Sequence, residues 1–254
     1  MKPYRIAVLL TLLLIVAAAT LWEQYLLSSW RNPLEVEIYP LNGDGSTVSA
    51  EYLQALEVAR FQEIAEFITR QSERYWVKLK PPVRFTLYAP VRSLPPLAPG
   101  AGANPLKIML WSLKLRYWAY RHQAGWWPRF GVVRMFVLYH VAQEGQPLHH
   151  SIGLRKGGIG VVHAFAHDGQ DGQNNIVIAH ELLHTLGATD KYDMANNLPV
   201  FPDGYGDSRQ VPLYPQRNAE IMAGRLALAD NRAIMPTSLE RCVIGARTAV
   251  EIGW

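Results

Sequence analysis

The chain contains four apolar stretches with the composition and length of β-strands. They are rich in Val, Ile, Leu, Phe and Tyr and cover residues 34–39, 83–88, 132–141 and 160–166. Alternating or short continuous apolar runs of this kind are typical of half-buried or buried strands. They predict a β-sheet assembled from segments that lie far apart in the sequence.

Segments with helical periodicity separate and follow these strands. Residues 49–76 contain neither Gly nor Pro and place apolar residues at helical spacing, which predicts one long amphipathic helix. Asn104 followed by Pro105 is typical of an N-cap and the first residue of another helix. Residues 238–252 predict a closing helix near the C-terminus.

The clearest helical pattern follows the fourth strand. Its apolar positions share one broad arc of a helix: Ile178, Ala179, Leu182, Leu183 and Leu186. Asn174 or Asn175 is expected to cap this helix, and Gly187 is expected to end it by adopting a left-handed conformation. The opposite arc, which includes His180 and His184, is expected to face a cleft.

The order of these elements predicts an α+β fold. We expect a twisted mixed sheet, a long backing helix, the helix that ends near Gly187, and a C-terminal helix. An apolar content of 49% with 18% charged residues is typical of a globular protein. The net charge of +4, without a dense Lys/Arg block, argues against nucleic-acid binding. The single cysteine, Cys242, excludes an intramolecular disulfide, and we expect it to be packed in the C-terminal helix.

The N-terminus predicts a membrane segment. Two basic residues precede an uncharged run from Ile6 to Trp22, which is long enough for a short spanning helix. We therefore expect residues 1–30 to be a signal anchor, and residues 31–254 to form one domain on the periplasmic or extracytoplasmic side. Cleavage after Ala19 is the alternative, and it would release the domain as a secreted protein.

The helix after the fourth strand also carries the pattern HExxH, with its histidines at positions 180 and 184. Residues four apart lie on one helical face, so His180 and His184 can direct their imidazole nitrogens at one metal ion. Zinc accepts such nitrogens and a carboxylate oxygen at roughly 2.0–2.2 Å and keeps a further position for water. Glu181 is rotated by about 100° from His180 and is expected to act as the general base on that water.

A third metal ligand is expected after the glycine that ends the helix. Reversal of the chain at Gly187 gives Asp190 a short return path to the histidines, so Asp190 is the favoured ligand. Glu220 and Asp193 are the alternatives.

The segment from position 180 to 190, HExxHxxGxxD, resembles the zinc-binding sequence of metzincin proteases. The resemblance is to the variant with aspartate in place of the third histidine, found in small secreted proteases of the snapalysin type. Tyr192 matches a tyrosine of that variant, and Met222 in Glu-Ile-Met-Ala-Gly is similar to the methionine of the turn beneath the metal. Met235 is a second candidate for that methionine. The tyrosine expected two residues after Met222 is missing, so the transition-state hydrogen-bond donor stays open, with Tyr192 as a candidate.

These features predict a membrane-anchored zinc metalloendopeptidase that hydrolyses peptide bonds in peptide or protein substrates. It would use one catalytic Zn²⁺ ion, with the water activated by Glu181. One alternative is a catalytically silent zincin-fold module for binding or assembly, which the intact Glu181 disfavours. Another is a zinc hydrolase that acts on a non-peptide amide.

Four of the eight tryptophans lie among basic residues between Lys107 and Arg134: Trp111, Trp118, Trp126 and Trp127. Such a segment is typical either of core packing with a solvated face or of a helix that rests on a membrane surface.

Overall fold

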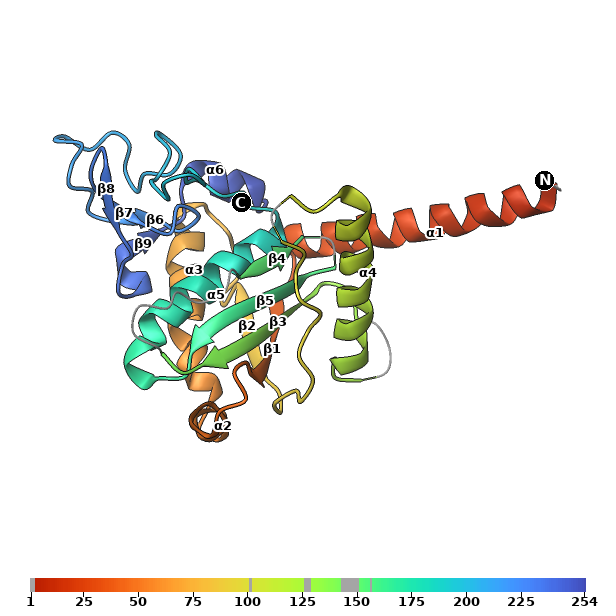
Figure 1. Cartoon of the computed structure of the whole chain (residues 1–254). Coiled ribbons are helices and arrows are strands. Elements are labelled where there is room, and N and C mark those ends of the chain that lie inside the picture. The colour runs from red at the N-terminus through yellow and green to blue at the C-terminus, as the bar shows by residue number, and fades with distance from the viewer. Residues whose placement is uncertain (1–2, 101, 126–128, 143–150, 156) are drawn as a thin grey trace.

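A five-stranded mixed sheet forms the centre of the molecule (Figure 1). The computed structural model describes residues 3–100, 102–125, 129–142, 151–155 and 157–254. The strands are β1 (Leu34–Asn42), β2 (Val83–Leu87), β3 (Val132–His140), β4 (Ile152–Leu154) and β5 (Ile159–Phe165). Their order across the sheet is β2-β1-β3-β5-β4, and only the edge strand β4 runs antiparallel to its neighbour.

The four strands expected from the sequence are confirmed, and the mixed sheet with its helices is compatible with the predicted α+β class. The sequence did not predict β4, which has three residues and a glycine at its centre. Such a strand is too short to show an alternating pattern. It forms because its backbone pairs with β5, with Gly153 opposite Gly160.

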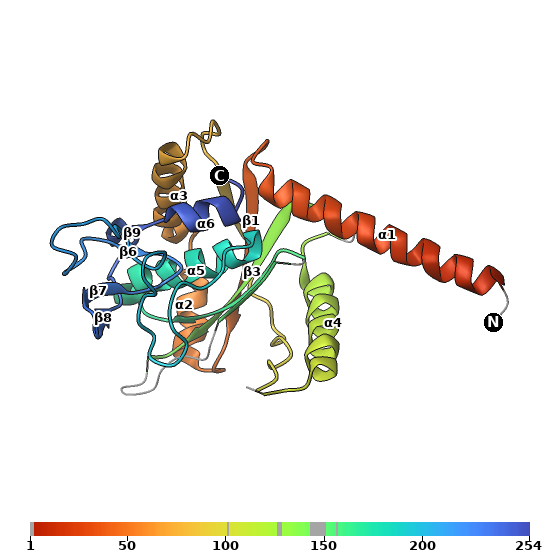
Figure 2. The same cartoon turned by 90° about the horizontal axis from the view of Figure 1, so that it is seen from above.

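Helices cover both faces of the sheet (Figure 2). One face packs against α2 (Thr47–Gln54), α3 (Gln62–Arg74) and α5 (Asp171–Leu186), which share a large apolar core. The other face packs against α4 (Pro105–His122) in a smaller core. The predicted N-cap of α4 is confirmed, because the Asn104 side chain accepts a hydrogen bond from the Lys107 amide at 2.8 Å.

The prediction of one continuous helix over residues 49–76 is wrong. The chain leaves the helix after α2, makes a 3₁₀ turn at Val58–Phe61 and continues as α3. Arg60 explains the break, because its carbonyl accepts a hydrogen bond from the Asn175 side chain at 3.0 Å and its guanidinium pairs with Asp171 at 2.7 Å. These contacts with α5 favour the turn over the helix that the local sequence prefers.

The predicted closing helix over residues 238–252 is also wrong in extent. A 3₁₀ turn (Leu239–Arg241) leads into β9 (Cys242–Val243), and only Ala246–Glu251 is helical, as α6. β9 pairs with β6 (Ala219–Glu220), next to a hairpin of β7 (Leu226–Ala229) and β8 (Arg232–Ile234). Cys242 is buried as expected, but in a strand, because pairing with β6 holds its backbone extended.

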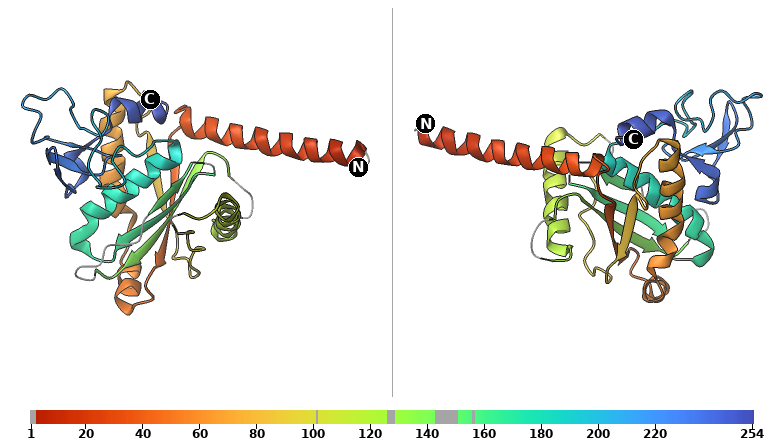
Figure 3. Two further views of the ribbon diagram at one scale, coloured as in Figure 1. Left: turned by 45° about the horizontal axis from the view of Figure 1, so that its top comes forward. Right: turned by 180° about the vertical axis from the view of Figure 1, so that it is seen from behind.

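The N-terminal helix α1 (Pro3–Ser28) projects away from the rest of the chain (Figure 3). Its segment Tyr4–Ser28 is long and apolar enough to cross a membrane or to serve as a signal sequence. Its last turns pack against the domain, where Leu27 is buried. The following Trp30 donates a hydrogen bond from Nε1 to the carbonyl of Ile252 at 2.8 Å. Residues near the C-terminus of the chain therefore hold the C-terminal end of α1 against the domain.

The side chain of Asn174 connects helix α5 to the sheet, although the sequence predicted Asn174 or Asn175 as the N-cap of this helix. The helix begins at Asp171, so Asn174 and Asn175 are not its N-cap but lie buried in its first turns. The Asn174 side chain accepts a hydrogen bond from the Phe165 amide at 2.8 Å and donates one to the Phe165 carbonyl at 2.9 Å. Asn174 thus acts as a strand partner at the end of β5.

Replacing Asn174 by leucine should destabilise the protein by about 1–3 kcal/mol, because both backbone groups of Phe165 lose their partner. Urea unfolding of the full chain in detergent, followed by circular dichroism, measures the effect. The control Gln62→Ala changes an exposed helix residue and should stay within about 0.5 kcal/mol of the wild type. Equal stability of the two variants would contradict this role of Asn174.

Candidate metal centre

Helix α5 presents three polar side chains to a cleft of about 590 Å³. Its apolar arc is buried as predicted, and the opposite arc places His180, Glu181 and His184 in the cleft wall. Ligand atoms of these three residues all lie within 4.8 Å of one another, so the group could hold a metal ion. Gly187 ends the helix in the predicted left-handed conformation, with φ 114°.

Backbone carbonyl groups fix the orientation of both imidazole rings. His180 donates a hydrogen bond from Nδ1 to the Ile221 carbonyl at 2.9 Å, and His184 donates one from Nδ1 to the Ala188 carbonyl at 2.8 Å. Because a carbonyl oxygen can only accept, the ring proton is assigned to Nδ1 in each neutral histidine. The Nε2 lone pairs of both rings are then available to a metal ion.

The structure brings Asp190 to the two histidines. Its Oδ1 atom lies 3.2 Å from His180 Nε2 and 3.1 Å from His184 Nε2. The two imidazoles hold the pKa of Asp190 well below its usual range despite the opposing effect of burial. Burial alone would lower the pKa of His180, but the contact with Asp190 raises it. Two imidazole nitrogens and one carboxylate oxygen therefore converge on one point at the cleft wall.

The two alternative ligands occupy other places. Asp193 accepts a hydrogen bond from the Ala195 amide at 2.9 Å and stabilises a turn after the site. Glu220 is completely buried, and its carboxylate accepts hydrogen bonds from the Met222 amide at 2.6 Å and the Thr248 hydroxyl at 2.7 Å. The amides of Ala223 and Gly245 also donate to Glu220. Neither carboxylate joins the histidines, and Glu220 instead links the turn after β6 to α6.

Glu181 is a buried carboxylate next to the two histidines. Its side chain is buried, and among the described residues its Oε2 atom has no hydrogen-bond partner. Burial raises the pKa of Glu181, and the neighbouring His180 and His184 partly oppose that shift. An unpartnered carboxylate oxygen lies beside two Nε2 atoms that both contact Asp190 Oδ1, and this is a donor arrangement that a metal ion and a water molecule would complete.

Gly153 of β4 allows this close packing, although no pattern in the sequence pointed to this glycine. A Cβ atom at this position would lie 2.5 Å from both the Glu181 carbonyl oxygen and the His184 Cβ atom. The edge strand can therefore approach α5 only with glycine here. The backbone amide of Gly153 also lowers the pKa of Glu181.

The turn after β6 lies next to His180. Ile221 supplies the carbonyl that orients that ring, and the Met222 carbonyl accepts a hydrogen bond from the Lys191 amide at 3.0 Å. The Met222 side chain is buried in the main core. Met235, the other candidate, lines the cleft instead.

Tyr192 lies in the cleft wall with the three polar residues of α5. Its backbone pairs with Pro199 in an isolated bridge. Burial and the negative charges of Asp190 and Glu181 raise the pKa of Tyr192, so its hydroxyl stays protonated and able to donate.

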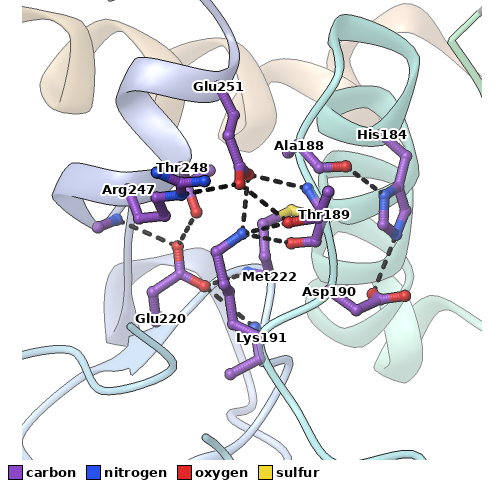
Figure 4. Close-up of polar contacts among 12 residues, drawn as sticks. His184, Ala188, Thr189, Asp190, Lys191, Glu220, Met222, Arg247, Thr248 and Glu251 are labelled. Carbon is purple, nitrogen blue, oxygen red and sulfur yellow. Dashed lines mark hydrogen bonds and ion pairs between the residues drawn. The ribbon is translucent and has the colours of Figure 1, made fainter. Parts of the chain in front are cut away.

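A network of hydrogen bonds around the buried Lys191 holds the segment that carries Asp190 (Figure 4). Lys191 donates hydrogen bonds from Nζ to the Thr189 carbonyl and to Glu251 Oε2, both at 2.7 Å. Glu251 also accepts a hydrogen bond from the Thr189 amide at 2.9 Å. The residues on both sides of Asp190 are thus tied to α6. Glu251 lies 60 residues after Lys191, and no local motif links the two.

Comparison of the chain with models of known protein families finds no match, and comparison with curated proteins finds none either. The residues and geometry of the site are therefore the basis for inferring its function.

Exchange of Glu251 for glutamine should weaken metal binding roughly 10–100-fold, the usual effect of losing a group that supports a ligand. The change keeps the shape of the side chain but removes the charge that Lys191 contacts, so Asp190 loses its fixed position. Arg247→Gln is the matched control, since Arg247 contacts the same carboxylate at 3.2 Å from an exposed position. Competition titration with a chromophoric chelator measures both affinities. A similar loss in both variants, or in neither, would contradict the positioning role of Glu251.

Proposed function

We propose that this chain is a membrane-anchored zinc metallopeptidase. One observation carries the proposal: the Nε2 atoms of His180 and His184 meet Asp190 Oδ1 beside the buried Glu181, whose Oε2 atom has no hydrogen-bond partner among the described residues. A buried carboxylate oxygen without a hydrogen-bond partner is costly in free energy, so the packing of the helix alone does not explain it.

Zinc is the metal that this donor set suits best. Two imidazole nitrogens with one carboxylate oxygen form a typical catalytic zinc site that keeps a position open for water. The hydrogen bonds from Nδ1 to the carbonyls of Ile221 and Ala188 supply the outer contacts that orient such ligands. The proposed ligands are thus His180, His184 and Asp190.

The residues around the ligands would share the chemistry. Zinc, when bound, would lower the pKa of a water molecule and polarise the carbonyl of the substrate. Glu181 would accept the proton of that water and deliver it to the leaving amine, and its burial keeps it poised for both steps. Tyr192, with its raised pKa, would donate a hydrogen bond to the developing negative charge.

The edge strand favours an extended peptide as the substrate. Ser151, Ile152 and Gly153 line the cleft, and β4 pairs with β5 along its other side. A peptide can add to such a strand by main-chain hydrogen bonds, which suits a protease better than a hydrolase of small amides.

The proposal includes a metzincin-like fold and an extracytoplasmic site. A parallel sheet with one antiparallel edge strand, the HExxH helix and the turn at Met222 support the first. The exposed, apolar α1 supports the second, because basic residues at its start would stay inside the cell.

The full chain purified in detergent should carry about one zinc ion per molecule. Both His180→Ala and Asp190→Asn should lower the zinc content, whereas Asp193→Asn should leave it unchanged, because Asp193 only stabilises a turn. Elemental analysis after dialysis measures the metal. Full zinc content in the His180 variant would rule out this site.

Glu181→Gln should keep the zinc and lose about 10²- to 10⁴-fold in turnover, the usual range for a general acid–base residue. Cleavage of a peptide library by the wild type and the variant, with metal content measured in parallel, tests this. Zinc-loaded wild type that cleaves no peptide but hydrolyses other amides would indicate a non-peptide hydrolase. Absence of any hydrolysis in both proteins would indicate a silent binding module.

A further inference from the structure

Helix α4 has two apolar faces, and among the described residues only one of them packs against the rest of the protein. The inner face contributes Leu115 and Ala119 to the small core. The outer face carries a stripe of apolar residues that are each between 46% and 66% exposed: Leu106, Met109, Leu110, Leu113, Tyr117 and Tyr120. Their spacing of three and four residues places them along one side of the helix. We call these six residues the outer stripe.

The tryptophans of α4 belong to its inner side. Trp111 donates a hydrogen bond from Nε1 to the Pro96 carbonyl at 3.0 Å, and Trp118 packs edge-on against Phe136 with ring centroids 4.7 Å apart. Trp126 and Trp127 lie outside the described residues. The packing interpretation therefore holds for Trp111 and Trp118, and the outer stripe consists of Leu, Met and Tyr side chains that the tryptophan pattern did not point to.

A row of cations borders the outer stripe. Lys107, Lys114 and Arg121 are exposed and follow one another at intervals of seven residues, so they line up along the helix. Among the described residues none of them forms an ion pair with a carboxylate. Helix α4 itself contains no Asp or Glu. An apolar stripe beside a row of cations suits the boundary of a bilayer with anionic headgroups.

The position of α4 relative to α1 also indicates that α4 lies at a bilayer surface. In each view α4 is the helix of the domain nearest to the projecting part of α1, and it lies across the direction of α1 (Figures 1, 2 and 3). The side chains of α1 are exposed from Tyr4 to Ala18, whereas Glu23 is half-buried and close enough to Arg116 of α4 for their charges to interact. A membrane crossed by α1 would therefore have its surface beside α4.

We propose that α4 lies on the surface of an anionic lipid bilayer, with its outer stripe inserted between the headgroups. This inference rests on the membrane anchor of the proposed function. Lys107, Lys114 and Arg121 contact the phosphates, and the six apolar side chains leave water. Attachment through both α1 and α4 fixes the orientation of the domain relative to the bilayer, whereas attachment through α1 alone would allow the domain to rotate.

Site-specific labels in the full chain, placed in nanodiscs of phosphatidylcholine and phosphatidylglycerol, test the proposal. Leu113→Cys marks the outer stripe, Leu13→Cys marks α1, and Val211→Cys is an exposed apolar control at 92% exposure. Cys242 is only 3% exposed and burial raises the pKa of its thiol to about 12, so maleimide labels the introduced cysteine. The readout is quenching of an environment-sensitive dye by nitroxides attached to lipid.

We expect quenching at Leu113 and Leu13 and none at Val211. Changing Lys107, Lys114 and Arg121 together to glutamine should weaken docking at Leu113 by roughly fivefold for each cation, and only where phosphatidylglycerol is present. The same triple change should leave quenching at Leu13 intact.

Quenching at Leu13 without quenching at Leu113 would overturn the proposal for α4 and leave the anchor standing. Quenching at Leu113 alone would uphold α4 as a membrane surface and overturn the spanning anchor. A blue-shifted dye at Leu113 that lipid nitroxides do not quench would identify a protein partner and also overturn the proposal.

Discussion

The orientation of two imidazole rings is the constraint on which the site depends. Each ring is held by one backbone carbonyl, Ile221 for His180 and Ala188 for His184, and both carbonyls lie outside α5. The helix alone brings the rings to one side, but it does not set the direction of their Nε2 atoms. That direction comes from the chain reversal after Gly187 and from the turn after β6. Two loops distant from each other in the sequence must therefore be correctly placed before the donor atoms can converge.

Two carboxylates outside the site, the buried Glu220 and the half-buried Glu251, hold these loops. Glu220 accepts hydrogen bonds from the Met222 amide in the turn after β6 and from the Thr248 hydroxyl of α6. Glu251, also on α6, is paired with Lys191 next to Asp190. Buried ionic groups are a weak source of stability because removing them from water costs most of what their pairing returns. Positioning explains them better, since both connect α6 to segments that touch the candidate metal centre.

The sequence predicted the parts of the fold and site that depend on local pattern. Four strands of the central sheet and the helix of the HExxH motif follow from periodicity, and the cap of α4 at Asn104 follows from local capping. The break between α2 and α3 could not be predicted in this way, because it depends on contacts of Arg60 with α5. The same reason applies to Glu251, whose partner Lys191 is near only in the folded chain. Gly153 had no local signal, since its importance comes from the approach of β4 to α5.

The most direct test of the central claim is X-ray absorption spectroscopy of the zinc-loaded full chain, compared with the His180→Ala variant. If His180, His184 and Asp190 hold the metal, the spectrum should fit two imidazole ligands and oxygen ligands at about 2.0–2.1 Å from the metal, with no sulfur ligand. The variant should lose one imidazole contribution or the metal altogether. An identical spectrum in both proteins, or a contribution from sulfur, would contradict the account, because the metal would then sit somewhere other than on α5.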